Sequence, residues 1–322
     1  MLQTSSSSRQ RLLRQFGLVA LLTGALANPA AAVLIDSGDG TGNTTAPADD
    51  PGFIHVGKRS QFSAVYVGNG WVLTANHTGV GPVEIDGVSY PDVAGSKVRF
   101  DDGGVAADLM AFQIDPSPAL PILPINANPS LTGESVIMAG NGNDRGAAVT
   151  ECGAIDGYAW SGSKSIRWGT NTIDSYLTAL STRSLVTDFD QGGSLHEAQN
   201  VNGDSGGALF VKNGTDWELA GILFALGAFG CQSPMTSLYG NQSYSVDLAT
   251  YRSQIIATVR PECSDEVDND GDGLTDFPDD PDCASLEGQS ETTPGVPGLG
   301  PAGLTFLAAT LLAGSATFRR RA

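Results

Sequence analysis

The chain has 322 residues, which is enough for one large domain or two of medium size. Hydrophobic residues make up 41% of it, so a sizeable core can be buried, and 41 glycines with only 7% aromatic residues favour a turn-rich β protein over a helical bundle. The formal net charge of −18 repels phosphate backbones, so nucleic acid is not an expected partner.

The first 32 residues have the layout of a secretory signal peptide. Arginines within 9–14 precede an apolar stretch over 16–27, and three alanines at 30–32 suit cleavage. The stretch is too short for a stable membrane anchor. We therefore expect an exported protein, in which disulfides can form.

The C-terminal residues have the composition of a second targeting signal. Residues 296–322 combine a short Pro-Gly motif, an apolar run over 304–318 and three terminal arginines. This tail resembles bacterial sorting tails of the PEP-CTERM kind, which implies processing by sorting machinery and a place at the cell surface or outer envelope. A plain transmembrane helix with a positive cytoplasmic end is the alternative. Linkers are expected at 33–51 and 284–295, from their composition.

The body over 52–260 reads as β structure. Short apolar runs are bounded by glycine and asparagine turns, and hairpins are predicted around 68–70 and 213–214. One helix is expected, at about 246–259. Strands followed by a single helix suggest a pair of barrels closed by that helix.

Three local signals in the body suit nucleophilic catalysis. An apolar run over 71–75 leads to His77, Asp108 begins another apolar run, and Ser205 lies among glycines. A serine hydroxyl needs an adjacent base, which would be His77, while Asp108 would hold the ring tautomer. The N–H groups of Gly203 and Ser205 would stabilise the oxyanion.

The glycine-flanked serine also fits the nucleophile elbow of α/β-hydrolases, in which the histidine follows the serine. All three histidines of this chain, His55, His77 and His196, precede Ser205. The elbow interpretation therefore lacks its base, and the order His, Asp, Ser remains.

These segments resemble a known family. Residues 71–77 are similar to its Trp-Val-Leu-Thr-Ala-Ala-His motif, 108–111 to its Asp-Ile-Ala-Leu strand, and 203–207 read Gly-Asp-Ser-Gly-Gly as its nucleophile loop does. The chain thus resembles trypsin-like serine proteases of bacterial type. The resemblance implies an all-β fold of two six-stranded antiparallel β-barrels of the chymotrypsin type with a C-terminal helix, one barrel over about 52–145 and the other over 146–260.

The resemblance also implies a substrate pocket and an activation route. The family's specificity position falls on Gln199, whose neutral side chain argues against a strict preference for Lys or Arg. The substrate-binding strand would be Phe224, Ala225 and Leu226. No basic cleavage site followed by Ile-Val-Gly-Gly is present, so only Val33, freed by signal cleavage, could provide the new N-terminus that pairs with Asp204.

Four cysteines in an exported chain suggest two disulfides, with three possible pairings. We favour Cys152–Cys231 and Cys263–Cys283. The second pair would close a loop of about 20 residues, which contributes about 3 kcal/mol in the chain-entropy model.

That loop, within an acidic segment over 261–283, matches the D-x-D-x-D-G core of calcium loops. Its alternating acids can point carboxylates to one side, and Gly273 permits the sharp turn. The segment resembles thrombospondin type 3 or dockerin-like loops, and an unstructured acidic spacer is the alternative. The candidate Ca²⁺ ligands are Asp268, Asp270, Asp272, Leu274 (by its carbonyl), Asp276 and Asp279.

The sequence therefore predicts an exported serine endopeptidase acting on proteins or peptides, with no cofactor for catalysis and structural Ca²⁺ in the acidic segment. Two alternatives from other classes stay open. The barrels could form a catalytically inactive binding module, or the chain could be a calcium-dependent surface protein.

Overall fold

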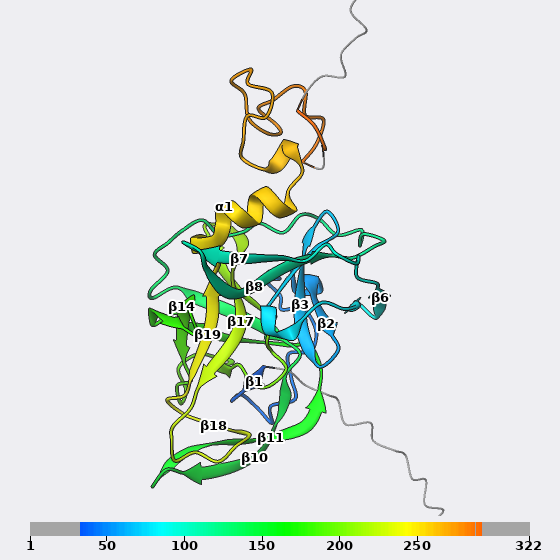
Figure 1. Cartoon of the computed structure of the whole chain (residues 1–322). Coiled ribbons are helices and arrows are strands. Elements are labelled where there is room, and N and C mark those ends of the chain that lie inside the picture. The colour runs from blue at the N-terminus through cyan, green and yellow to red at the C-terminus, as the bar shows by residue number, and fades with distance from the viewer. Residues whose placement is uncertain (1–32, 287, 292–322) are drawn as a thin grey trace, which may run out of the picture.

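The computed structural model describes residues 33–286 and 288–291. Two large antiparallel sheets form the body, helix α1 lies against one end of them, and a small loop-rich unit follows beyond α1 (Figure 1). The predicted signal peptide and the predicted C-terminal tail lie outside the described residues. Among the described residues, no helix has the length and apolar character needed to span a bilayer.

The first sheet has the strand order β6-β5-β2-β3-β4-β8-β7. Its strands are β2 (Val56–Arg59), β3 (Phe62–Gly68), β4 (Trp71–Thr74), β5 (Val83–Ile85), β6 (Val88–Tyr90), β7 (Val98–Asp102) and β8 (Val105–Gln113). The hairpin predicted around 68–70 is confirmed as the β3–β4 connection, where three consecutive residues have positive φ. Glycine occupies two of these three positions, so the turn carries little backbone strain.

The second large sheet has the order β12-β9-β16-β17-β19-β14-β13. Its strands are β9 (Ser135–Gly140), β12 (Arg167–Thr172), β13 (Ser175–Ala179), β14 (Thr182–Asp188), β16 (Ala208–Asn213), β17 (Asp216–Gly227) and β19 (Gln242–Asp247). The hairpin predicted at 213–214 is confirmed between β16 and β17. Each large sheet has seven strands, one more than expected for each barrel.

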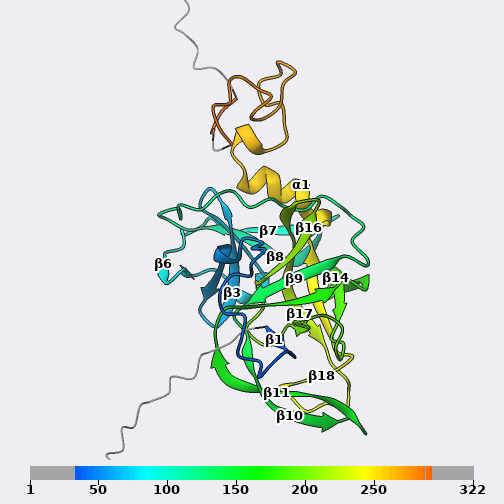
Figure 2. The same cartoon turned by 180° about the vertical axis from the view of Figure 1, so that it is seen from behind.

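Two smaller sheets complete the body. One pairs β10 (Asn143–Glu151), β11 (Ile155–Lys164) and β18 (Thr236–Leu238), and it lies at the opposite end of the molecule from α1 (Figure 2). The other joins β1 (Leu34–Ile35) to β15 (Ala198–Gln199).

A shared hydrophobic core joins the two large sheets. It contains Val65 and Leu109 from the first sheet, Phe210 and Ile222 from the second, and Tyr251 from α1 (Leu248–Val259). All five are at most 1% exposed. The predicted helix over about 246–259 is confirmed, although it begins two residues later, because Val246 and Asp247 still belong to β19. Strands packed this tightly hold their ends rigidly.

The segment over 33–51, for which a linker is expected, begins inside the body. Val33, Leu34 and Ile35 are each 1% exposed. The guanidinium of Arg145 donates hydrogen bonds to the carbonyls of residues 35, 36 and 38, which fixes the segment against β10. From residue 36 to residue 51 the segment has no helix or strand.

Both expected disulfides are present, as Cys152–Cys231 and Cys263–Cys283. The first links the β10–β11 turn to the loop before β18. The second closes the small C-terminal unit, which contains the short 3-10 helix η3 (Glu262–Ser264). A hydrogen-bonded ion pair between Arg252 of α1 and Glu266 ties this unit to the body.

Candidate active site

The register of the first sheet brings His77 and Asp108 to one edge. Strand β4 pairs antiparallel with β8, and Thr74 lies opposite Met110. Residues just after Thr74 and just before Met110 must therefore emerge at the same end of the sheet. His77 lies there in a short 3-10 helix, η2 (Asn76–Thr78), that follows β4 directly.

The imidazole and carboxylate form a two-point contact. Nδ1 of His77 lies 2.7 Å from Oδ2 of Asp108, and the backbone N–H of His77 donates to Oδ1 at 2.8 Å. With Nδ1 donating to the carboxylate, Nε2 is the ring nitrogen that can accept a proton. The ring is 42% exposed and the carboxylate 15%, so the base faces solvent while its partner is sheltered.

The environment of Asp108 favours its ionised form. Burial alone would raise the pKa of this carboxyl, but hydrogen bonds from the ring and backbone of His77 lower the pKa below its ordinary value. The backbone N–H of Asp108 donates to Oγ1 of Thr182, the first residue of β14, at 2.8 Å. The second sheet therefore helps to position the acid.

The loop that carries Ser205 leads into β16, and its shape requires glycine at position 206. Gly206 has φ of 90°, and a Cβ there would lie 2.0 Å from the carbonyl oxygen of Ser63 and 2.1 Å from Oγ1 of Thr74. No other residue fits so close to two neighbours. The N–H of Gly206 donates to the carbonyl of Leu223 on β17 at 2.7 Å.

Strand β3 brings the serine loop and the histidine together. The carbonyl of Ser205 accepts the backbone N–H of Ser63 at 2.9 Å. The neighbouring Phe62 ring meets the His77 ring edge-on, with centroids 5.9 Å apart. In the described part of the chain, no hydrogen bond joins the Ser205 hydroxyl to His77. Such bonds are often long without substrate and tighten when it binds.

Two backbone N–H groups of the serine loop have no partner. Within the described residues, the backbone N–H groups of Gly203 and Ser205 have no hydrogen-bond partner. The peptide that contains the Gly203 N–H is held at its other end, because the carbonyl of Asn202 accepts the N–H of Asn143 at 3.0 Å. The next carbonyl, that of Gly203, accepts the hydroxyl of Ser63 at 3.0 Å. That hydroxyl in turn accepts the N–H of Asn141 at 2.7 Å.

The carboxylate next to the serine is fully buried. Asp204 is 0% exposed, accepting the N–H of Val201 at 2.7 Å and the N–H of Val33 at 3.2 Å. Burial raises its pKa to about 7 despite these hydrogen bonds. The sequence had indicated Val33, as a new N-terminus, as the partner of Asp204.

The residues predicted for the substrate pocket differ in burial. Gln199 is 1% exposed, with Nε2 donating to the carbonyl of Gln242 at 3.3 Å and Oε1 buried without a partner among the described residues. Phe224 belongs to the shared core, while Ala225 and Leu226 are half-buried on β17, opposite β19. The pattern had not indicated Gln242, which lies 43 residues from Gln199.

A lysine that no motif indicates lies beside Gly203. Nζ of Lys164 donates to the carbonyl of Gln61 at 2.9 Å, and a Cβ on Gly203 would be 2.6 Å from that Nζ. Burial lowers the pKa of Lys164. It lies at the end of β11, which no local pattern connects to the serine loop.

The acidic unit brings only some of its predicted ligands together. Carboxylate oxygens of Asp268, Asp270 and Asp272 lie within 4.8 Å of one another. Asp276 is not among them, and its oxygens accept the N–H groups of residues 265 and 266 at 3.0 and 2.8 Å. Asp279 is also outside this group, and the side chain of Leu274 is 39% exposed.

Comparison with known proteins identifies a family. The family described as Trypsin matches residues 41–247, more than half of the chain. Similar solved structures include a mutant of human heparin binding protein (17% identity, TM-score 0.45, 67% of this chain and 94% of that one) and Kallikrein-related peptidase 10 (18%, 0.43, 68% and 99%). A Mycobacterium tuberculosis protease in an inactive form also matches (17%, 0.41, 64% and 89%). No curated protein sequence matches significantly.

Proposed function

Since this chain belongs to the trypsin family, we propose that it is a serine endopeptidase that hydrolyses peptide bonds through an acyl-enzyme. The observation that carries the proposal is the two-point contact between His77 and Asp108 beside the loop of Ser205. Protein or peptide substrates follow from the family.

In the proposed mechanism, Nε2 of His77 takes the proton of the Ser205 hydroxyl while the oxygen attacks the scissile carbonyl. The same proton passes to the leaving amine, and a water then repeats the sequence to release the acid. Asp108 keeps Nδ1 protonated and stabilises the imidazolium. Its lowered pKa supports this role, because the carboxylate stays ionised at neutral pH.

The tetrahedral oxyanion would accept the N–H groups of Gly203 and Ser205. Both groups lack partners within the described residues. The carbonyls of the same two peptides, those of Asn202 and Asp204, accept the N–H groups of Asn143 and Gly207 at 3.0 and 2.7 Å. Loss of one such donor costs about 3–4 kcal/mol in the barrier. The donors are therefore fixed before substrate arrives.

Activation is proposed to accompany export. The N–H of Val33 already lies 3.2 Å from Asp204, and Val33 follows the predicted cleavage site directly. Cleavage before Val33 would replace that N–H with an ammonium group, which pairs more strongly with a carboxylate. Two disulfides support an oxidising compartment. Surface sorting through the tail over 296–322 remains part of this proposal.

A structural calcium ion is proposed in the acidic unit, at Asp268, Asp270 and Asp272 with the carbonyl of Leu274. The clustering of the three carboxylates supports it. Asp276 and Asp279 would need to move to join them. The ion would stiffen the unit, and catalysis does not require it.

A fluorophosphonate probe tests the catalytic proposal, because it reacts only with an activated serine. The chain beginning at Val33 should label, and Ser205→Ala should abolish labelling. Ser89→Ala is the matched control, since Ser89 is exposed on β6 away from the loop and should label like the parent chain. Labelling that survives in Ser205→Ala would refute the nucleophile assignment, and no labelling of the parent would favour an inactive binding module.

A further inference from the structure

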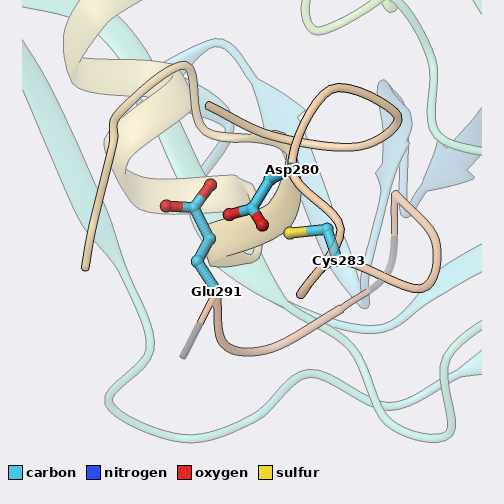
Figure 3. Close-up of side chains that lie close together, drawn as sticks. All are labelled: Asp280, Cys283 and Glu291. Carbon is cyan, nitrogen blue, oxygen red and sulfur yellow. The ribbon is translucent and has the colours of Figure 1, made fainter. Parts of the chain in front are cut away.

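Two buried carboxylates face each other in the C-terminal unit, beside the predicted calcium loop but outside its Asp268–Asp272 cluster. Asp280 is 1% exposed and Glu291 is 0% exposed. Their oxygens and the sulfur of Cys283 lie within 4.8 Å of one another, and the Asp280 carboxylate lies between the other two groups (Figure 3). The second residue of the pair lies outside the segment assigned to calcium by sequence.

The hydrogen bonds of this pair leave one oxygen unpaired. Glu291 accepts the N–H of Asp276 at 2.9 Å on one oxygen and the N–H of Asn269 at 2.5 Å on the other. Oδ1 of Asp280 accepts the N–H of Asp282 at 2.7 Å. Oδ2 of Asp280 is buried and has no hydrogen-bond partner among the described residues. A buried acceptor without a donor is costly, and more so when it is anionic.

The unit itself carries no positive charge that could neutralise the pair, and the guanidinium that reaches it from α1, that of Arg252, pairs with Glu266. Residues 261–291 contain twelve acidic residues and no Lys, Arg or His. Two buried carboxylates this close repel each other, and a cation between them would remove that repulsion. N–H donors already occupy both oxygens of Glu291, and the buried Oδ2 of Asp280 is available as a ligand for such a cation.

The donor set selects a hard cation. Cys283 is bonded to Cys263, so its sulfur is not a thiolate and the anionic ligands are oxygens only. Calcium binds oxygen at about 2.3–2.6 Å, so oxygens on opposite sides of one ion are at most roughly 5 Å apart. The spacing of the two carboxylates fits within that limit.

We propose that Asp280 and Glu291 together bind one calcium ion, separate from the Asp268–Asp272 cluster. The ion would connect Asp280, close to the disulfide at Cys283, to Glu291 in the segment over 288–291. The same segment is held at Gly288, whose carbonyl accepts the N–H of Cys263 at 3.1 Å. Calcium at this site therefore fastens the C-terminal side of the unit to its core.

The test counts bound calcium on the full chain, after removal of metal with a chelator, by titration calorimetry with CaCl₂. Asp280→Asn should bind one ion fewer than the parent chain. Asp272→Asn is the matched control, because it changes an exposed carboxylate of the neighbouring cluster and should leave the Asp280-dependent ion in place. Equal numbers of ions in the parent and Asp280→Asn would overturn the proposal, as would a parent that binds none.

Limited proteolysis with and without calcium separates loss of ion binding from misfolding of the variant. An asparagine at position 280 keeps the shape and can donate its amide to Glu291, so Asp280→Asn should fold without calcium. Its C-terminal unit should resist proteolysis in chelator, whereas the parent unit becomes cleavable. A shared proton instead of a cation predicts that chelator leaves the parent unit resistant at neutral pH, which would also overturn the proposal.

Discussion

The backbone N–H of Val33 lies 3.2 Å from Oδ1 of Asp204, although 171 positions separate the two residues. Val33 has φ of 40°, which is unfavourable for a β-branched residue. Its side chain is nevertheless fully buried, and Leu34 and Ile35 continue as β1 beside Gln199. The pairing sets the environment of the carboxyl next to the proposed nucleophile.

The first prediction concerns the pH dependence of stability while the bond before Val33 is intact. Burial raises the pKa of Asp204 from 3.8 to about 7. The folded state therefore holds a proton that the unfolded state releases, and stability falls as pH rises from about 4 to about 7. The full loss is about 4 kcal/mol. Urea unfolding of the Ser205→Ala precursor at several pH values measures it, and Asp204→Asn should flatten this part of the curve.

The second prediction concerns the chain that begins at Val33. Its ammonium should pair with the Asp204 carboxylate and increase the rate of fluorophosphonate labelling about tenfold or more, since a hydrogen bond between charged groups contributes about 1.5–3 kcal/mol. The comparison is a chain with one extra alanine before Val33. The pairing needs a charged ammonium and an ionised Asp204. The advantage therefore declines as pH rises past the usual ammonium pKa of about 8, and also as pH falls and the Asp204 carboxylate takes up a proton. Equal labelling of the two chains at pH 7 would contradict the activation route.

The third prediction concerns the acid of the triad. Asp108→Asn keeps the size of the side chain but can donate to Nδ1 of His77, which favours the wrong ring tautomer. We expect kcat to fall by about 10⁴, with little change in KM. Peptidase assays measure both constants. Asp101→Asn, on the neighbouring strand β7, is the control and should retain activity. A loss below tenfold in Asp108→Asn would remove this residue from the mechanism.

Much of the fold could be predicted because its signals are local. The β3–β4 turn needs residues that tolerate positive φ, and Gly68-Asn69-Gly70 provides them in three consecutive positions. The contact of His77 with Asp108 also follows from local patterns, since two adjacent antiparallel strands bring their ends to one edge. Four cysteines allow three pairings, and the path of the folded chain determines which cysteines meet.

Other features depend on contacts that no local pattern encodes. Lys164 reaches the serine loop because β11 ends beside Gln61, 103 residues away in sequence. Glu291 meets Asp280 because the chain turns back after the disulfide, past the end of the recognisable calcium motif. The calcium motif itself predicts Asp276 as a ligand, but its carboxylate turns to the backbone N–H groups of residues 265 and 266 and lies outside the cluster.

The fourth prediction concerns the close approach of the serine loop to β3. Gly206→Ala would place a methyl group 2.0 Å from the carbonyl oxygen of Ser63, where strand pairing leaves no room to move. Overpacking and a positive φ together should lower the free energy of unfolding by about 3 kcal/mol, and the displaced Ser205 should lose labelling. Gly162→Ala on β11 is the matched control, because no atom lies within 4 Å of the added carbon. Urea unfolding and probe labelling of both variants measure these two effects. A Gly206→Ala chain as stable and as reactive as Gly162→Ala would mean that the serine loop does not pack on β3 in solution.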